Sequence, residues 1–228
     1  MTQGRPSPRV KICGVRTVDD VETAVVAGTD GIGVICDVPV ASPREVSADR
    51  ARELLAAVPP FVTGTLVTMP DSADRVCDLV GRVGADAVQI HGGLDPDEVA
   101  TVGSSIHQPV LYAVASDALE SVHQYDSCVD ALVVDTATES GAGGTGRTHD
   151  WNRTREATDE VDSPVVLAGG LTPENVAEAI EIVSPFAVDV AGGVESVPGV
   201  KDPARVRAFV DRVTETGASQ IAADVGVR

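Results

Sequence analysis

The sequence predicts a single (β/α)8 barrel, and three observations support that fold class. Short apolar runs alternate with longer amphipathic stretches between Val10 and Val213. Eight such runs occur, each followed by a helical pattern, which is the number expected for eight βα units joined by right-handed crossovers. The chain has 228 residues, which suits one barrel and leaves no room for a second domain. An open doubly wound sheet is the structural alternative that the same alternation allows.

The strands are expected in the short runs, which are rich in valine, as is typical of parallel strands buried on both faces. In chain order they are Val10–Cys13, Gly31–Cys36, Val62–Val67, Ala87–Ile90, Val110–Val114, Ala131–Val134, Val165–Ala168 and Ala187–Val190. The helices are expected at Asp19–Ala27, Ala48–Val58, Ser72–Val83, Pro96–Val102, Asp117–Tyr125, Trp151–Thr158, Pro173–Val183 and Pro203–Val213. Residues 1–228 form one domain in this interpretation, with residues 1–8 and 218–228 as loosely ordered tails.

Three helices are expected to begin at a capping residue that is followed by proline. These starts are Asp95-Pro96, Thr172-Pro173 and Asp202-Pro203. A side-chain oxygen at the N-cap accepts a hydrogen bond from a free backbone N–H, and proline suits the first helical position.

The charge balance is strongly acidic, with 17 Lys and Arg against 35 Asp and Glu and a net charge of −18. Such a balance excludes a basic nucleic-acid-binding face. It is typical of a protein adapted to very high salt, because the Debye length falls to about 3 Å at molar ionic strength and surface repulsion is screened. An ordinary acidic cytosolic protein is the alternative.

The four cysteines are widely spaced and include no C-x-x-C pair, which argues against a zinc site or a disulfide framework. No run of 18 apolar residues occurs, and the first nine residues have no apolar signal core. We therefore expect a cytoplasmic protein without a membrane span or a nucleic-acid partner. The sequence carries no signal for the oligomeric state.

The first strand predicts a thiol at the mouth of the barrel. Side chains alternate along a strand, so Lys11 and Cys13 share the face opposite to Val10 and Ile12. The apolar face is expected to meet the helices, which leaves Lys11 and Cys13 pointing into the barrel. A cysteine can also be a small core residue, but Cys13 precedes a glycine at a strand end, where this fold places its active site.

The sixth strand ends on a carboxylate, because Asp135 follows four apolar residues. Burying a carboxylate there is costly unless it is hydrogen-bonded or functional. Asp135 is therefore a candidate acid, and an acidic cap on the following loop is the alternative.

Two glycine pairs follow the seventh and eighth strands, Gly169-Gly170 and Gly192-Gly193. Glycine lets the backbone approach an anion and point its N–H groups at it. Loops after strands seven and eight are where this fold usually holds a phosphate. Glycines that simply make turns are the alternative.

The remaining candidate features, a glycine-rich stretch, an arginine and the histidines, indicate a function less specifically. Residues 141–146 match G-x-G-x-x-G, but the preceding strand ends at Asp135, too far upstream for a dinucleotide site, and a mobile active-site loop is the better interpretation. Arg44 offers a planar fork that suits a carboxylate, although a loop arginine can also be a solvated charge. His91 at a strand end can be structural, and His107, His123 and His149 are assigned no role.

Taken in order, these pieces resemble the phosphoribosylanthranilate isomerases along nearly the whole chain. The matching stretches are Lys11–Gly14, Ser42–Arg44, Gln89–Gly92, Val134–Thr136, Gly143–Arg147, Asp150–Trp151, Gly169–Val176, Val188–Val190, Gly193–Glu195 and Pro198–Asp202.

The resemblance implies an Amadori rearrangement of N-(5-phosphoribosyl)anthranilate in tryptophan biosynthesis. Asp135 then corresponds to the general acid and Cys13 to the general base, with Lys11 as the candidate group that favours the thiolate. Arg44 corresponds to the partner of the anthranilate carboxylate, and the two glycine pairs correspond to the phosphate site. The further substrate-binding residues that it implies are Lys11, Gln89, His91 and Asp189. The partner is a small phosphosugar substrate, and no metal or organic cofactor is implied.

The chain departs from the family pattern in three places, two in the expected anthranilate pocket and the third in the expected phosphate loop. Strand two lacks the usual aromatic residue, strand three lacks the usual Gly and Phe near its end, and Ala191-Gly192 replaces a serine pair. Two functional alternatives remain. One is another phosphate-binding barrel enzyme, such as indole-glycerol-phosphate synthase, which would need a catalytic lysine on an inner strand end. The other is a non-catalytic phosphosugar-binding barrel, which would not need Cys13 and Asp135 together.

Overall fold

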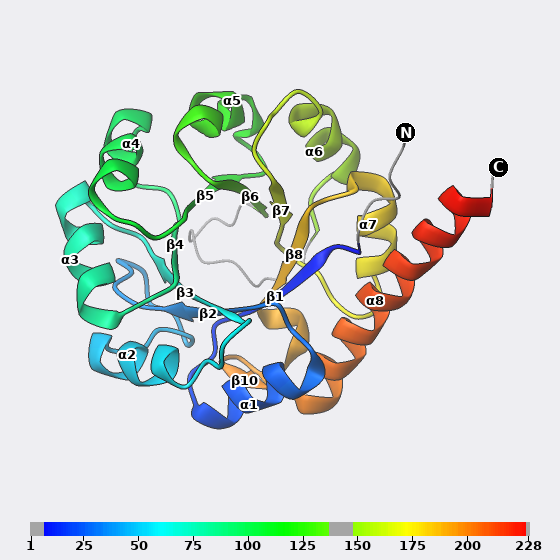
Figure 1. Ribbon diagram of the computed structural model, residues 1–228, viewed down its shortest axis with the longest axis horizontal. Helices are drawn as coiled ribbons and strands as arrows, with labels where there is room; N and C mark the ends of the chain where they lie inside the picture. Colours follow the sequence, from blue (N-terminus) through cyan, green and yellow to red (C-terminus); the bar gives the residue numbers. More distant parts are fainter. Residues whose placement is uncertain (1–6, 137–147, 227–228) are drawn as a thin grey trace.

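Eight parallel strands form a closed barrel surrounded by helices (Figure 1). The computed structural model describes residues 7–136 and 148–226, with side chains through residue 218. Each strand pairs with its neighbours in sequence, and β8 pairs with β1 to close the ring. The predicted (β/α)8 barrel is confirmed, and the open doubly wound sheet is excluded.

The strands lie close to their expected positions. They are β1 (Arg9–Cys13), β2 (Gly31–Ile35), β3 (Thr63–Thr68), β4 (Ala87–Ile90), β5 (Val110–Ala115), β6 (Ala131–Asp135), β7 (Val165–Leu167) and β8 (Ala187–Val190). The helices are α1 (Val18–Ala27), α2 (Ala48–Ala56), α3 (Ala73–Val83), α4 (Pro96–Ser105), α5 (Val122–Tyr125), α6 (Trp151–Thr158), α7 (Val176–Val183) and α8 (Pro203–Gly226). The single helix expected at Asp117–Tyr125 is instead the 3-10 turn η1 (Leu119–Ser121) followed by the short α5, and a second turn, η2 (Asp126–Cys128), comes next.

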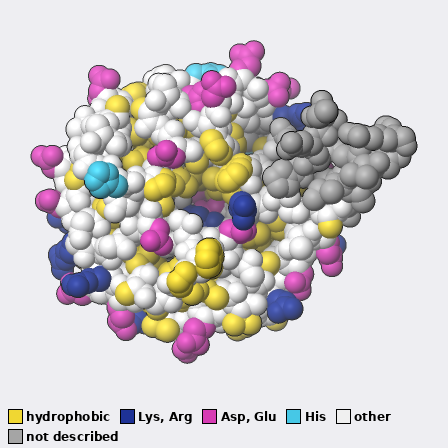
Figure 2. All heavy atoms as spheres, viewed as in Figure 1, with side chains coloured by type: hydrophobic (Ala, Val, Ile, Leu, Met, Phe, Trp, Pro, Cys, Tyr) yellow, Lys and Arg dark blue, Asp and Glu magenta, His cyan; other side chains and the backbone are white. Residues whose placement is uncertain are grey.

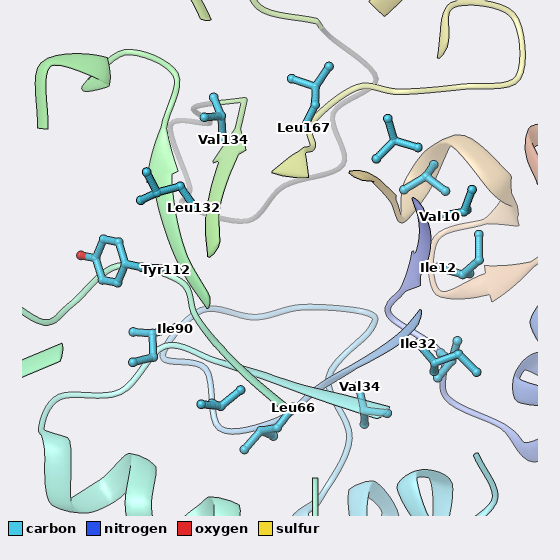
Figure 3. Packing of buried hydrophobic residues seen from close by; sticks show 14 of the residues in the cluster. Val10, Ile12, Ile32, Val34, Leu66, Ile90, Tyr112, Leu132, Val134 and Leu167 are labelled. Atoms are coloured by element: carbon cyan, nitrogen blue, oxygen red, sulfur yellow. The ribbon is translucent and has the colours of Figure 1, made fainter. Parts of the chain in front are cut away.

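Alternate side chains of the strands point away from the barrel toward the helices and form the main core. Figure 3 shows ten of these residues in place: Val10, Ile12, Ile32, Val34, Leu66, Ile90, Tyr112, Leu132, Val134 and Leu167. This arrangement confirms the expected alternation on the first strand, with Val10 and Ile12 on the helix side.

The barrel interior is divided into an apolar side and a polar side. Small apolar side chains from β5 to β8 fill one side, namely Ala113, Ala131, Val133, Val166, Ala168 and Ala187. Buried polar side chains fill the other side, namely Lys11, Thr65, Gln89 and Asp189. Because buried polar groups need partners, the polar side is the part of the interior where a specific network is expected.

Two of the three expected helix starts are confirmed. Asp95 caps α4 and forms a reciprocal capping box with Glu98, and Asp202 accepts hydrogen bonds from the first turn of α8. The start at Thr172-Pro173 is wrong, because α7 begins at Val176 after Asn175. The Asn175 side chain accepts from the Thr172 N–H and donates to the Gly170 carbonyl, and these bonds hold residues 172–175 in a turn.

The C-terminal part of the chain holds two features that the sequence pattern does not show. A 3-10 turn, η3 (Gly192–Val194), leads from β8 into an antiparallel hairpin of β9 (Glu195–Val197) and β10 (Val200–Lys201). Helix α8 then begins at Pro203 as expected and continues to Gly226, so its last turns fall in the stretch expected to be a tail. No helix in the described part of the chain is both long and apolar enough to span a membrane.

Acidic side chains are spread around the rim of the face that Figure 2 presents rather than gathered in one patch. Basic side chains lie among them, several close to carboxylates. On this face the acidic side chains are therefore dispersed rather than clustered.

Candidate active site

A pocket opens at the carboxyl ends of the strands, the end where (β/α)8 barrels hold their active sites. Its lining comes from the ends of β1 to β4 and β6 to β8 and from the loops that follow them. The lining residues are Cys13, Ile35, Val38, Val40, Ser42, Arg44, Val67, Met69, Gln89, His91, Asp135, Ala168, Gly169, Gly170, Leu171, Asp189, Val190, Ala191, Gly192 and Gly193. Every residue of the predicted site therefore lines one pocket except Lys11, which lies below it.

Lys11 forms the floor of the site on the polar side of the barrel. Its Nζ donates to Gln89 Oε1 at 2.8 Å and to Asp189 Oδ2 at 2.7 Å, with all three residues buried. Asp189 Oδ1 is buried and has no protein hydrogen-bond partner among the described residues. Since Asp189 also lines the pocket, this oxygen is a candidate acceptor for a ligand hydroxyl.

Cys13 lies at the end of β1 beside Gly33 of β2, its direct partner in the sheet. A Cβ on Gly33 would come within 2.8 Å of the Cys13 sulfur, so glycine is needed there to make room for the thiol. Burial raises the pKa of the Cys13 thiol above its ordinary value. The positive charge of Lys11 acts in the opposite direction, followed by that of Lys201.

Asp135 ends β6, as predicted, and is largely buried. Its Oδ1 accepts a hydrogen bond from the Thr136 N–H at 2.7 Å, and its Oδ2 lies 3.8 Å from His91 Nε2. Burial raises the pKa of the Asp135 carboxyl, with the nearby His91 opposing that shift. A carboxyl group of raised pKa at a pocket wall is suited to donating a proton.

The glycine pairs shape the wall formed by the loops after β7 and β8. Gly169 and Gly170 adopt positive φ angles of 81° and 67°. A Cβ on Gly169 would collide with Thr136, and one on Gly193 would collide with the Leu171 carbonyl oxygen. The two loops therefore pack against each other through bare backbone, which leaves their N–H groups close to the pocket.

Arg44 reaches the pocket from the loop after β2 and is buried. Its Nε and Nη2 each donate to the Glu195 carboxylate at 2.8 Å, a bidentate pair. Glu195 also accepts from Lys201 Nζ at 3.0 Å and from the Gly199 N–H at 3.0 Å. The sequence pattern alone does not single out Glu195 or Lys201 as members of the site, although both lie in the stretches that carry the resemblance and Lys201 is one of two lysines.

An aliphatic wall lies in the same pocket as Arg44. It is formed by Ile35, Val38, Val40, Val67 and Met69. These side chains lie in the part of the chain where the family pattern usually has aromatic residues. The departures in strands two and three therefore leave the pocket wall apolar, but its side chains are aliphatic instead of aromatic.

His149, which the sequence left without a role, contacts the residue that follows Asp135. Its Nδ1 is 3.0 Å from Thr136 Oγ1, and burial lowers the pKa of its imidazole. The G-x-G-x-x-G stretch at 141–146 and the matching stretch Gly143–Arg147 lie outside the described residues.

The closed barrel and its pocket define a (β/α)8-barrel enzyme with a thiol and a carboxyl group at the carboxyl ends of its strands. Comparison with known proteins then identifies the family. The family model for N-(5'-phosphoribosyl)anthranilate isomerase matches residues 10–212. The isomerase of Halobacterium salinarum is 54% identical over 211 residues, covering 91% of this chain and 96% of the relative. The isomerase of Halorubrum lacusprofundi is 53% identical over 202 residues, covering 89% and 94%.

Solved structures agree with that assignment. A crystal structure of phosphoribosylanthranilate isomerase from Thermotoga maritima superposes with a TM-score of 0.82 at 33% identity, covering 91% of this chain and 99% of that one. Another, in complex with reduced 1-(o-carboxyphenylamino)-1-deoxyribulose 5-phosphate, gives 0.79 at 31% identity, covering 91% and 99%.

The chain belongs to the phosphoribosylanthranilate isomerase family. Its activity is the isomerisation of N-(5'-phosphoribosyl)anthranilate in tryptophan biosynthesis, EC 5.3.1.24. Several of its relatives at 50% identity or more come from haloarchaea, which agrees with the salt adaptation expected from composition.

Proposed function

We propose that Asp135 is the general acid and Cys13 the general base of this isomerisation. The observation that carries the proposal is that the two groups end β6 and β1 and line the same pocket. The reaction needs one proton delivered to the ribose ring oxygen and one proton removed from C2′. It needs no electron acceptor and no metal, so acid–base groups supplied by the protein are sufficient for it.

The first step opens the ribose ring. The bond between C1′ and the ring oxygen breaks with its electron pair going to oxygen, and this oxygen takes the proton from the Asp135 carboxyl. The lone pair of the anthranilate nitrogen forms the C1′ iminium at the same time. Burial of Asp135 supports this role, because it raises the pKa of the carboxyl group and so favours the protonated form that a general acid needs.

The second step removes the C2′ proton. The Cys13 thiolate takes it, and the C–H electron pair forms a C1′–C2′ double bond while the iminium electrons return to nitrogen. The resulting enolamine tautomerises to the ketone of the product. A cation beside a thiol lowers its pKa, so the iminium formed in the first step and the ammonium of Lys11 together favour the thiolate when the base acts.

The two ends of the substrate have distinct partners in this proposal. The phosphate binds to backbone N–H groups of the loops that contain Gly169, Gly170, Gly192 and Gly193. The anthranilate carboxylate binds to Arg44, and the ring packs on the aliphatic wall. A phosphoribosylanthranilate isomerase that shares this fold was solved with a reduced analogue that carries both groups.

The remaining predicted residues contact the sugar between these two ends. Gln89, His91 and Asp189 line the middle of the pocket, and Asp189 Oδ1 is available to a ribose hydroxyl. Lys11 acts from below by orienting Gln89 and Asp189. The substrate is thus a small phosphosugar, and the acidic charge supports a cytoplasmic enzyme of a salt-adapted cell without a nucleic-acid partner.

The experiment follows loss of phosphoribosylanthranilate fluorescence at several salt concentrations. Cys13→Ser and Asp135→Asn are each expected to lower kcat by about 10²–10⁴-fold, the usual contribution of a general acid or base. Both are expected to keep their affinity for inorganic phosphate as a competitive ligand.

Matched controls lie at the opposite end of the barrel. Cys128→Ser changes a thiol that donates to the Tyr125 carbonyl, and Asp126→Asn changes a carboxylate that accepts from the Ser163 N–H. Both are expected to retain turnover. If wild type binds phosphate but turns over no substrate at any salt concentration, the residue roles proposed above are wrong.

A further inference from the structure

We propose that the β9–β10 hairpin is a positioning element for Arg44, acting through Glu195, and that it thereby sets the affinity for the carboxylate end of the substrate. The inference rests on the proposed role of Arg44 as partner of that carboxylate. Glu195 touches no reacting atom in this scheme, so it is a positioning residue.

Glu195 is the centre of the contact. Four hydrogen bonds converge on its carboxylate: two from Arg44 at 2.8 Å, one from Lys201 Nζ at 3.0 Å and one from the Gly199 N–H at 3.0 Å. The Glu195 and Lys201 side chains are almost fully buried, at 3% and 1% exposure. A bidentate pair fixes both the position and the plane of a guanidinium, so Glu195 determines the orientation in which Arg44 meets a ligand.

The hairpin also contacts the backbone just before Arg44, and the residue after β1 contacts the aliphatic stem of Arg44. Gly14 and Gly199 both have positive φ angles, of 74° and 81°. A Cβ on Gly14 would lie 2.7 Å from Arg44 Cδ, and one on Gly199 would lie 2.5 Å from the Pro43 carbonyl oxygen. The tip of the hairpin therefore packs on the residue before Arg44, while the strand end that carries Cys13 packs on its stem.

Lys201 links this cluster to the phosphate side of the pocket. Its Nζ donates to the Ala191 carbonyl oxygen at 3.0 Å as well as to Glu195. Ala191 and Gly192 both line the pocket. One buried network thus connects the loop that carries Arg44 with the loop after β8, and so connects the two ends of the substrate site.

The charges of the cluster suit an incoming anion. Arg44 and Lys201 carry two positive charges and Glu195 carries one negative charge, so the cluster keeps one net positive charge beside the aliphatic wall. An arginine that is already held in place loses less conformational freedom when a ligand binds. A single aromatic carboxylate therefore suits this corner by charge, by the aliphatic wall beside it and by the low entropy cost of binding.

The test compares Glu195→Gln, Arg44→Met and a control, Asp37→Asn. Asp37 lies in the same loop as Arg44 and accepts a bidentate pair from Arg75 at 2.7 and 2.8 Å, but neither residue lines the pocket. Steady-state kinetics with phosphoribosylanthranilate gives KM and kcat. Competitive inhibition by anthranilate and by inorganic phosphate then reports on the two ends of the site separately.

Glu195→Gln is expected to raise KM and to weaken anthranilate inhibition by about tenfold or more, because a displaced binding group costs up to about 100-fold. Its kcat should stay within about threefold and its phosphate inhibition should not change. Arg44→Met should show a larger loss of the same kind, and Asp37→Asn should resemble wild type.

Three results would overturn the inference. If Arg44→Met loses anthranilate inhibition and Glu195→Gln keeps it, the hairpin does not position Arg44, while the proposed function stands. If Arg44→Met itself keeps it, the carboxylate role of Arg44 is wrong, and the inference fails with it. If Glu195→Gln weakens phosphate inhibition by the same factor, the residue is merely structural. Should Glu195→Gln fail to fold by near-UV circular dichroism, Glu195→Asp, which keeps the charge but shortens the side chain that holds Arg44, is measured against the same expectations.

Discussion

Lys11 and Asp189 are direct partners on the neighbouring strands β1 and β8, and their side chains meet at 2.7 Å inside the barrel. Burial alone would lower the pKa of Lys11, but the charges of Asp189 and Cys13 outweigh burial, and the pKa is raised. Lys11 is therefore a fixed ammonium one layer below Cys13. From this position its positive charge favours the thiolate form of Cys13, as expected from the sequence.

Lys11→Met is expected to raise the pKa of the Cys13 thiol. The variant removes the cation that stabilises the thiolate and leaves the negative charge of Asp189 unpaired, and both changes act in the same direction. At a fixed pH below that pKa, alkylation of Cys13 by iodoacetamide should slow by about three- to tenfold, since each pKa unit is a factor of ten in thiolate. Mass spectrometry of the Cys13 peptide separates it from the other three cysteines.

The control for this measurement is Gln89→Leu, which removes a hydrogen-bond partner of Lys11 and keeps the cation. Its alkylation profile should stay close to that of wild type. A Lys11→Met variant with an unchanged pH midpoint of alkylation would show that Lys11 does not lower the pKa of the Cys13 thiol.

Gly193→Ala is expected to disrupt the loop after β8, because the added methyl group would collide with the Leu171 carbonyl oxygen. Inorganic phosphate should then inhibit at least tenfold more weakly, and thermal unfolding should begin at a lower temperature. The matched control is Gly81→Ala in α3, where a Cβ meets nothing within 4 Å. That change should stabilise the protein by about 0.5–1 kcal/mol, because alanine costs less backbone entropy than glycine in a helix. Unaltered phosphate inhibition in Gly193→Ala would contradict the proposed phosphate site.

The pH dependence of stability is expected to depend on Glu195. Burial alone would raise the pKa of Glu195, but the hydrogen bonds from Arg44 and the charge of Lys201 outweigh it and hold the pKa below its ordinary value of 4.5. A carboxyl group whose pKa is lowered in the folded state contributes stability that is present above 4.5 and lost as the pH falls through the lowered value. Wild type should therefore lose stability on acidification below about pH 4.5.

Glu195→Gln should show a shallower acid dependence and a lower stability at neutral pH, by about 3–5 kcal/mol, because breaking a buried pair leaves uncompensated charge. Chemical denaturation at a series of pH values, at one high salt concentration, measures both effects. If the variant and wild type show equal acid dependence, the acid sensitivity belongs to other carboxylates. Asp126 is a candidate, because hydrogen bonds from Asp162 and Ser163 lower its pKa.

The fold could be predicted from local pattern because the barrel is built from local units. Each strand contains short apolar stretches, and Asp95 and Asp202 mark helix starts that the structure confirms. The helix start predicted at Thr172-Pro173 was wrong because the same residue types also form turns. The contact that fixes the turn here is the hydrogen bond from the Thr172 N–H to Asn175 Oδ1. Propensity does not distinguish a capped helix from a turn that precedes one.

The site was predictable where a residue's position in its own strand carries the information. Cys13 and Asp135 follow from their places at strand ends, and the residues predicted for the site, other than Lys11, line one pocket. The pairing of Arg44 with Glu195 joins positions 151 apart in sequence, and no local pattern encodes a contact of that range. For the same reason the sequence indicates that Arg44 can bind a carboxylate ligand, but it does not show that Arg44 is already paired with the carboxylate of Glu195.

The hairpin after β8 has a consequence for how the molecule matures. The contacts that complete the site, Lys11 with Asp189 and Arg44 with Glu195, span 178 and 151 positions. Contacts of such range form late in folding, because the entropy of closing a long loop must be overcome first. A chain still emerging from the ribosome can pair β1 with β2 and β3, but Lys11 lacks Asp189 and Arg44 lacks Glu195 until β8 and β9 have been synthesised. In the proposed mechanism turnover needs both contacts, so turnover regained during refolding would report that β1 has paired with β8.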